Sequence, residues 1–525
     1  MPGHSSDTQK PLETSSVCLN YVAEDMADER YYKNTTSEEW FNLLAFLSSG
    51  RITIPLLLLI IPTVLAISKL FWIWLVKYKL RYTLRITTVF FIFFLFLDLV
   101  CSLLCAYDVA HTLTESVNVP LREHIYFATL LSGTMFLTMI AVRYHWSMPL
   151  DIKRNLNSRE RNHLKYPMVS YKNIERIIHN RVDQGNSEFM PPVYTNGWIP
   201  IIESRSLNKG SVIPVEALGQ RFCVYRTEEG KAHIVDPYCP HLGADLSVGG
   251  CVVGENIQCP FHGWQFSGKD GVCRVIPYAN KVPDIAKTKV WPTRERNGYI
   301  FVWYHAEDCS PDWEMPSIPD VEEGRWIFRG RTEHEAKCHI QEIPENGADV
   351  AHLHHLHSPS VFLGSKNKTE SALSLWSLVA NVWHEWEPIW EPDDERRHVA
   401  RMQLKQHTRI GRFNVPFSSL KMNIEQIGPA TVHMHMETFF GKAVLLQHIT
   451  PLAPFRQKII HLLYTEPSFR QFPADLFILA EAVMLERDIE IWNNKKFLKY
   501  PIILKEDTFI RKYRCWYSQF YSANS

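Results

Sequence analysis

The sequence has no excess of charge of either sign and no dense framework of cysteines. Its 525 residues include 56 basic and 56 acidic side chains, so the formal net charge is zero. Binding to nucleic acid needs a local excess of basic side chains, and no basic stripe with interleaved aromatic residues occurs, which argues against nucleic acid as a partner. Eleven cysteines are too few for a disulfide scaffold. A composition of 46% hydrophobic and 21% charged residues excludes a wholly disordered chain.

What the chain has instead is a concentration of apolar residues in its first third. Three apolar runs occur there, at residues 52–76, 87–110 and 125–142. A helix that spans a bilayer needs about 20 mostly apolar residues. The first two runs reach this length, and the third is shorter and interrupted by Gly133. We therefore expect a transmembrane region of three helices at 51–143, preceded by an acidic, mostly disordered tail at 1–50.

The distribution of Lys and Arg gives an expected orientation in the membrane. The loop between the first two runs holds four basic residues and no acidic one, and residues 143–181 hold nine basic against three acidic residues. Cytosolic loops of membrane proteins are rich in Lys and Arg, so both segments and the large C-terminal part are expected in the cytosol. If the third run lies only at the membrane surface, either the tail or the C-terminal part changes side.

The pattern changes again after the membrane region. Residues 144–190 are polar and are expected to form a linker. From residue 191 to 305, short β-branched and aromatic runs alternate with Gly, Pro and Asn. Such runs, bounded by turn residues, predict an antiparallel β domain.

Two short loops of this β domain carry a metal-binding pattern. The first loop holds Cys239 and His241, and the second holds Cys259 and His262. A zinc site and a Rieske [2Fe–2S] centre can both use two Cys and two His. Zinc fingers usually take two ligands of one type from one segment, whereas each loop here supplies one of each. The pattern therefore favours a [2Fe–2S] cluster, in which two thiolates hold one iron and two imidazoles hold the other.

A second group of possible ligands lies downstream. Its pattern is N-x2-D-x2-H-x4-H, formed by Asn346, Asp349, His352 and His357. Two His and one carboxylate are typical of non-haem Fe(II) oxygenases. Asp349 and His352 share a helix face, but His352 and His357 are five residues apart, which an ideal helix separates by about 140°. Both can bind one metal only if the helix distorts or ends. The alternative is a His-rich surface helix, because His354 and His355 are also present.

The third ligand of such a site should be a carboxylate far down the chain. The segment 485–492 offers Glu486, Asp488 and Glu490. Its residues alone leave the choice open, and all three can also be solvated charges on a helix.

The cluster loops resemble those of the Rieske family. Ala244 and Phe261 stand where the cytochrome bc1 branch has disulfide cysteines, and Trp264 matches the oxygenase branch. From about Gly197 to the C-terminus, the chain resembles the Neverland-type cholesterol 7-desaturases of animals and, more loosely, bacterial 3-ketosteroid 9α-hydroxylases. The segment 516–521 is similar to the ends of such steroid-acting enzymes.

This resemblance implies an α+β chain, with the N-terminal transmembrane helices, an antiparallel Rieske domain and a helix-grip (START-like) catalytic domain at 306–525. It implies Asp488 as the third iron ligand. It also implies that Asp349 bridges a Rieske histidine of a neighbouring subunit to His352, and hence a homotrimer.

The implied reaction is the conversion of cholesterol to 7-dehydrocholesterol in steroid hormone synthesis. It would use O2 and NAD(P)H-derived electrons, passed by a reductase or ferredoxin to the [2Fe–2S] cluster and then to Fe(II). The endoplasmic reticulum is the expected location. Three alternatives remain: a steroid hydroxylase of the same family, a pure electron carrier, and a non-catalytic membrane sterol-binding protein.

Overall fold

The structure is a computed structural model that describes residues 147–154, 191–357, 380–385, 390–410, 413–496, 498 and 501–522. The chain divides into two compact units, Met1–Val142 and Arg143–Ser525, and all described residues belong to the second. The expected tail and the three expected membrane spans lie outside the described residues. Within the part that is described, no helix is long and apolar enough to cross a bilayer.

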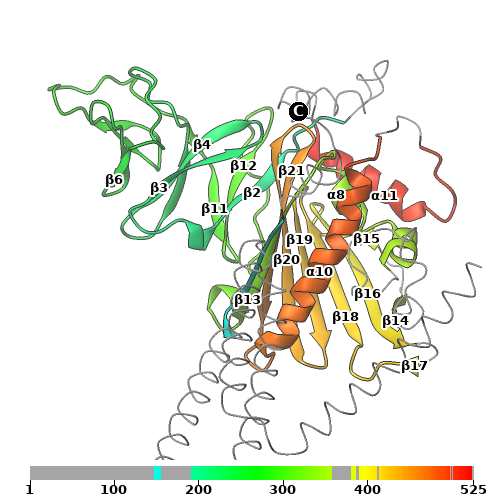
Figure 1. The fold of residues 1–525 in the computed structure, drawn as a ribbon. Helices are drawn as coiled ribbons and strands as arrows, with labels where there is room; N and C mark the ends of the chain where they lie inside the picture. Colours follow the sequence, from blue (N-terminus) through cyan, green and yellow to red (C-terminus); the bar gives the residue numbers. More distant parts are fainter. Residues whose placement is uncertain are drawn as a thin grey trace, which may run out of the picture. The chain divides into compact units, whose positions relative to one another are not determined.

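The first domain of the second unit consists of three small sheets, drawn in green in Figure 1. Their strand orders are β10-β5-β4-β3, β11-β12-β2 and β6-β7-β8-β9. The strands are β2 (Gly197–Glu203), β3 (Val212–Ala217), β4 (Gln220–Arg226), β5 (Ala232–Val235), β6 (Cys251–Val253), β7 (Asn256–Gln258), β8 (Gln265–Ser267), β9 (Cys273–Val275), β10 (Val290–Trp291), β11 (Thr293–Arg296) and β12 (Tyr299–Tyr304). Every pairing among them is antiparallel, as the sequence pattern predicts.

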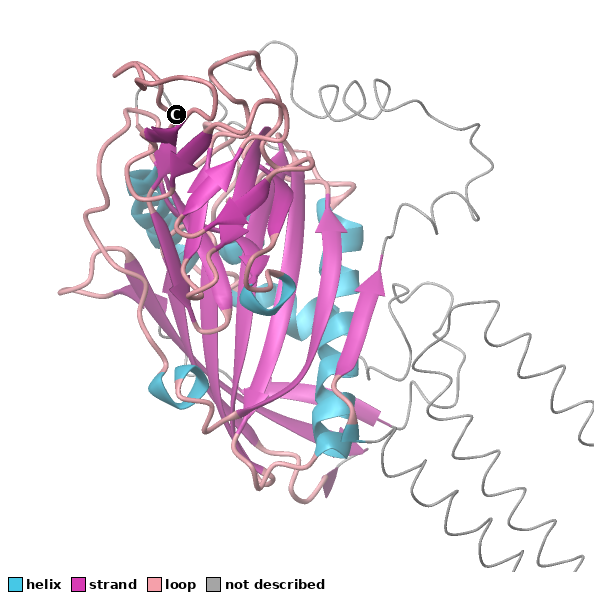
Figure 2. Ribbon diagram, turned by 90° about the vertical axis from the view of Figure 1, so that its left-hand side faces the viewer, coloured by secondary structure: helices cyan, strands magenta, loops and turns pink. Residues whose placement is uncertain are grey.

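The second domain is a ten-stranded sheet with a long helix, α10 (Gln471–Trp492), lying across one face (Figures 1 and 2). The sheet order is β1-β13-β21-β20-β19-β18-β16-β14, and β15 and β17 also pair with β16. The strands are β1 (Leu150–Arg154), β13 (Ile327–Ala336), β14 (Ala380–Glu385), β15 (Trp390–Pro392), β16 (Val399–Ile410), β17 (Phe413–Asn414), β18 (Leu420–Ile427), β19 (Thr431–Thr438), β20 (Gly441–Ala453) and β21 (Arg456–Thr465). Shorter helices are α7 (Pro319–Glu322), α8 (Glu342–Glu345), α9 (Val350–His352) and α11 (Thr508–Tyr517). The domain is therefore α+β, as expected.

Alternation along the strands gives this sheet two different faces. Gly330 marks the inner face, because a Cβ there would lie 2.6 Å from Ile478 Cδ1 on α10. The residues in register with it across the sheet are Leu463, Leu445, Met434, Ile424 and Met402. This row is entirely apolar, so the inner face and α10 bury a common core.

The outer face of the sheet packs against the first domain. Val444, Leu446, Ile460 and Leu462 of β20 and β21 belong to one buried cluster with Trp198, Tyr299 and Phe301 of β2 and β12. Burying a large apolar side chain contributes about 1.5–3 kcal/mol. The two domains therefore share a core.

Strand β1 differs from the linker expected at 144–190. Its residues Leu150–Arg154 pair in parallel with β13, and Leu150 and Ile152 are buried while Asp151 and Lys153 are exposed. The alternation is too short and too polar to stand out in the sequence. The neighbouring strand supplies the backbone partners that stabilise it.

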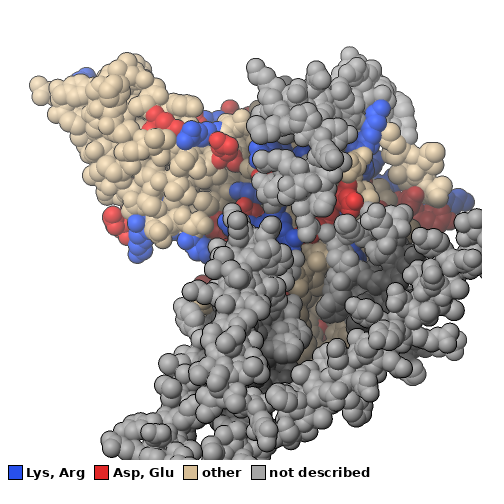
Figure 3. All heavy atoms as spheres, in the orientation of Figure 1, with Lys and Arg blue, Asp and Glu red and all other residues tan. Residues whose placement is uncertain are grey.

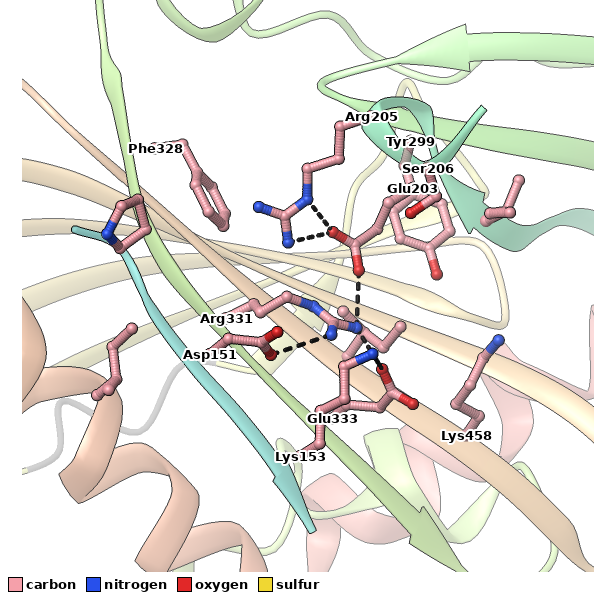
Figure 4. A pocket seen from close by; sticks show the side chains of 14 residues that line it. Asp151, Lys153, Glu203, Arg205, Ser206, Tyr299, Phe328, Arg331, Glu333 and Lys458 are labelled. Atoms are coloured by element: carbon pink, nitrogen blue, oxygen red, sulfur yellow. Dashed lines mark hydrogen bonds and ion pairs between the residues drawn. The ribbon is translucent and has the colours of Figure 1, made fainter. Parts of the chain in front are cut away.

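A buried ion-pair network holds β1, β2 and β13 together around a cavity of about 450 Å³ (Figure 4). The guanidinium of Arg331, whose side chain is 4% exposed, lies 2.7 Å from Glu203 Oε1 and 3.2 Å from Asp151 Oδ1. It also contacts Glu333 at 2.5 Å. These carboxylates come from three different strands, so one cation joins the two domains and the first strand of the sheet.

We predict that Arg331→Met lowers the free energy of unfolding by about 3 kcal/mol, because it leaves the buried Glu203 carboxylate with less compensation. The measurement is urea unfolding followed by tryptophan fluorescence. Arg325→Met is the matched control, since Arg325 is 51% exposed and pairs with Asp320 at the surface. That change should cost less than about 1 kcal/mol. Equal losses in the two variants would contradict a structural role for the buried network.

Candidate metal centres

The two cluster loops of the first domain have the same backbone turn. In the first, Gly243 N donates to Cys239 O at 2.9 Å, and Cys239 N donates to Ala244 O at 2.9 Å. In the second, Gly263 N donates to Cys259 O at 3.1 Å, and Cys259 N donates to Trp264 O. Both glycines have a positive φ, +75° and +73°, which side chains disfavour. The repeated turn presents one Cys and one His from each loop to a common centre.

The cysteines and the histidines of the two loops differ in how deeply they are buried. Cys239 and Cys259 are 3% and 1% exposed and carry free thiols. His241 and His262 are half-buried, with ring centroids 4.7 Å apart, and Trp264 stacks on His241. His241 Nδ1 is buried without a hydrogen-bond partner in the structure. An orphaned imidazole nitrogen beside two free thiols fits a metal ligand, and the imidazoles are more exposed than the thiols.

Each loop supplies one thiol and one imidazole, Cys239 with His241 and Cys259 with His262. This donor set is the one that holds a Rieske [2Fe–2S] cluster, with two thiolates on one iron and two imidazoles on the other.

The second site forms where a helix distorts. Asp349 caps α9, its carboxylate accepting from His352 N at 3.2 Å, and the next residues, Leu353–His357, form a π-helical turn. A π turn closes after five residues instead of four. It therefore brings His357 onto the side of His352, and their rings lie 5.2 Å apart. Of the two possibilities that the sequence left open, a distortion or an end of the helix, the structure shows a distortion.

Helix α10 supplies the carboxylate. Asp488 Oδ1 lies 3.0 Å from His357 Nε2, although the two residues are 131 positions apart. Glu486 instead turns toward Arg154, 3.3 Å away, and His334, 3.6 Å away. Glu490 is exposed. Of the three carboxylates that the sequence left open, the structure places Asp488 beside the two histidines.

The surroundings of His352 favour the neutral imidazole that a metal binds. Burial lowers the pKa of His352, and His357 adds to this, while Asp488 opposes it. His352 Nδ1 hydrogen-bonds to the backbone carbonyl of Asp349. With Nδ1 donating there, Nε2 is the nitrogen left for a metal, as is common for metal-binding histidines. The Asp349 side chain is 33% exposed, and its Oδ1 lies 4.0 Å from His352 Nδ1.

One ionisable residue near this site was missed by the sequence analysis. Glu481 lies two turns before Asp488 on α10, on the same helix face. Burial raises the pKa of Glu481 to about 7, with Asp488 adding to the rise and His357 opposing it. The seven-residue spacing from Asp488 was the signal available in the sequence, but such spacing is common in helices.

Comparison with known proteins gives the family. A model of the Rieske [2Fe–2S] domain matches residues 197–288, and a model of the 3-ketosteroid 9alpha-hydroxylase C-terminal domain matches residues 302–521. The chain is 42% identical to cholesterol 7-desaturase nvd 1 of Ciona intestinalis, over 68% of this chain and 74% of that protein. It is 38% identical to cholesterol 7-desaturase nvd of Xenopus laevis, over 81% of this chain and 92% of that protein.

The chain belongs to the cholesterol 7-desaturase family of Rieske oxygenases. Its cofactors are accordingly a Rieske [2Fe–2S] cluster and one mononuclear iron, for which the residues described above provide fitting donors. Among solved structures, NdmA of Pseudomonas putida aligns with 65% of this chain and 91% of its own, at 18% identity and a TM-score of 0.46.

We predict that Asp488→Ala removes the mononuclear iron but leaves the cluster. Iron per chain should fall from about three to about two, while the visible absorption of the [2Fe–2S] cluster persists. Glu490→Ala on the same helix is the control and should retain all the iron, because Glu490 is exposed. Iron loss in the Glu490 variant but not in the Asp488 variant would reverse the assignment.

Proposed function

We propose that this protein desaturates cholesterol between C7 and C8. Cholesterol loses one hydrogen from each carbon, and O2 is reduced to two waters by those hydrogens together with two electrons from NAD(P)H and two protons. The electrons arrive through a reductase or ferredoxin. The observation that carries the proposal is the triad of His352, His357 and Asp488 in a chain that belongs to the cholesterol 7-desaturase family.

Residues in different parts of the chain would have different roles in this reaction. When bound, the cluster passes single electrons and the mononuclear iron activates O2. Asp349 fixes the ring of His352 through its backbone carbonyl, which would leave Nε2 as the nitrogen that holds the iron. The apolar row that includes Met434, Ile424 and Met402 gives the inner face of the sheet surroundings that suit an apolar substrate and disfavour water. The long helix across this face supports the helix-grip arrangement expected for the domain.

The proposed desaturation can be tested with cholesterol carrying deuterium at C7. Membranes that contain the protein and a reductase should form a conjugated 5,7-diene that has lost label, detected by sterol mass spectrometry. The His352→Ala variant should form about 100-fold less diene or none, because it lacks an iron ligand. A hydroxylated sterol in place of the diene would contradict desaturation and support the hydroxylase alternative, since both reactions use the same metal ligands.

We further propose that electrons cross between subunits of a head-to-tail homotrimer. Large apolar side chains surround the cluster loops at the surface: Tyr238, Leu242, Phe261 and Tyr278 are each about 60% exposed. Around β6, at the far end of the first domain, the visible surface carries few charged side chains (Figure 3). An apolar surface next to half-buried His241 and His262 suits docking against another subunit. The partly exposed carboxylate of Asp349 could then contact an incoming imidazole.

Transfer between subunits predicts complementation of two inactive variants. Cys259→Ser lacks the cluster but keeps the iron site, and His357→Ala has the reverse defect. Co-expressed in equal amounts, they should regain about a quarter of the wild-type activity, because that share of neighbouring pairs joins an intact cluster to an intact iron site. Each variant co-expressed with itself is the control. No recovery in oligomers shown to be mixed would mean that electrons stay within one chain.

We also propose that the protein is a multi-pass membrane protein of the endoplasmic reticulum, with the unit 143–525 in the cytosol. The apolar runs at 52–76, 87–110 and 125–142 would supply the spans. Exposed aromatic residues at one end of the ten-stranded sheet support a lipid surface nearby. They are Phe417 (65% exposed), Phe439 (61%), Phe440 (48%) and Phe472 (52%). A sterol substrate would reach the protein from such a surface.

A further inference from the structure

A polar row crosses the inner face of the catalytic sheet. Two residues after Gly330 on β13 comes Thr332, whose side chain lies on the same face. The residues in register with it are His461 on β21 and Gln447 on β20. Beyond them the row continues with Val432 and Gln426. The amide of Gln426 is occupied, since it bonds to Trp390 Nε1 and to Pro344 O. The polar side chains of Thr332, His461 and Gln447 therefore form a distinct group, which we call the His461 cluster.

Glu481 from α10 completes the His461 cluster. His461 Nε2 lies 2.9 Å from Gln447 Oε1, and His461 Nδ1 lies 3.3 Å from Thr332 Oγ1. Glu481 Oε1 lies 3.7 Å from the same Nδ1. Three strands and the helix thus direct polar atoms at one imidazole.

The protonation of this cluster gives each group a defined role. His461 is 1% exposed, and burial lowers its pKa to about 3, so the imidazole is neutral. Because Gln447 Oε1 can only accept, His461 Nε2 carries the proton and Nδ1 accepts. The raised pKa of Glu481, about 7, gives its carboxyl group a proton to donate near neutral pH.

Two members of the cluster keep capacity for an additional partner. The side chain of Glu481 is 26% exposed, and Gln447 is half-buried, although both lie between the sheet and α10. The Gln447 amide nitrogen can donate a hydrogen bond, and a Glu481 oxygen can accept one. A hydroxyl group needs this combination, one donor and one acceptor. An apolar ligand would leave both unmatched.

The distance along α10 between Glu481 and the iron ligand Asp488 can be compared with the dimensions of a sterol. Seven residues separate Glu481 from Asp488, which is about 10 Å along the helix at nearly the same angle. Carbon 7 of a sterol lies one ring away from the carbon that carries the 3β-hydroxyl. The distance of about 10 Å along α10 therefore matches two lengths taken together. One is the distance from the 3β-hydroxyl to carbon 7, and the other is the separation between carbon 7 and a metal held by Asp488.

We propose that Glu481 and Gln447, supported by His461, bind the 3β-hydroxyl of the sterol and thereby determine which carbon faces the iron ligands. This assignment rests on the proposed function, since it presupposes a sterol substrate. Glu481 is a positioning residue here, because it acts through the orientation of the substrate.

The test compares cholesterol with cholest-5-ene, which lacks only the hydroxyl. A hydroxyl bound by two partly buried polar groups should give the wild-type protein a preference for cholesterol of about 100-fold in kcat/KM. In Glu481→Leu and in Gln447→Leu the preference should fall below about 10-fold, through slower turnover of cholesterol and not of cholest-5-ene. A loosened sterol should also yield products altered at carbons other than C7.

Two controls separate this role from a loss of structure. Glu490→Gln, on the exposed side of the same helix, should keep the wild-type preference. Glu481→Gln keeps hydrogen-bonding capacity and should keep most of the preference, with normal iron content in every variant compared.

The outcomes distinguish the two proposals. If the wild-type protein turns over neither sterol, the proposed function fails and this assignment fails with it. If the wild-type protein desaturates cholesterol but Glu481→Leu slows both sterols equally, the preference is unchanged and only the hydroxyl assignment is overturned. That result would indicate that Glu481 acts on O2 chemistry or on folding instead.

Discussion

The contact between His357 and Asp488 is the constraint on which the functional part of the structure depends. Two segments 131 residues apart must meet within 3.0 Å. One segment reaches that point through a π-helical turn, which places His357 on the side of His352. The other is a long helix held against the sheet by Ala474, Ile478 and Ala482, which are all buried in one apolar cluster. A small shift of either segment would separate the three ligands, so the packing of α10 is also what preserves the metal site.

The ten-stranded sheet also positions the first domain, which carries the cluster loops. Its outer face shares a core with β2 and β12, and Arg331 adds an ionic link between the domains where β1 joins the sheet. Interiors packed at this density transmit displacements instead of absorbing them. The cluster loops are therefore carried on a rigid body, with the thiols inward and the imidazoles toward the surface.

Desolvation explains the unusual protonation of the catalytic domain. Burial lowers the pKa of His433 and of His461 to about 3 and raises that of Glu481 to about 7. All of these shifts favour the uncharged form, because the loss of water outweighs the interactions that oppose it, such as that of His357 with Glu481. Uncharged groups suit an interior that accepts a lipid: they retain hydrogen-bonding capacity for one polar atom of a ligand without an ionic penalty against the rest of it.

The features that rest on local chemistry could be predicted from the sequence. Cys239, His241, Cys259 and His262 could be recognised because each loop is a short turn that needs its own glycine and carries its own ligands. The spacing of His352 and His357 meant that the helix must distort or end there if both histidines bind one metal. The folded chain shows that it distorts, as a π turn, and that Asp488 faces the histidines while Glu486 and Glu490 do not. Carboxylates two residues apart on a helix point about 200° apart, so their roles follow from which side packs against the sheet. Strand β1 and the position of Glu481 likewise depend on partners far away in the chain, and distant contacts of that kind leave no local pattern for the sequence to display.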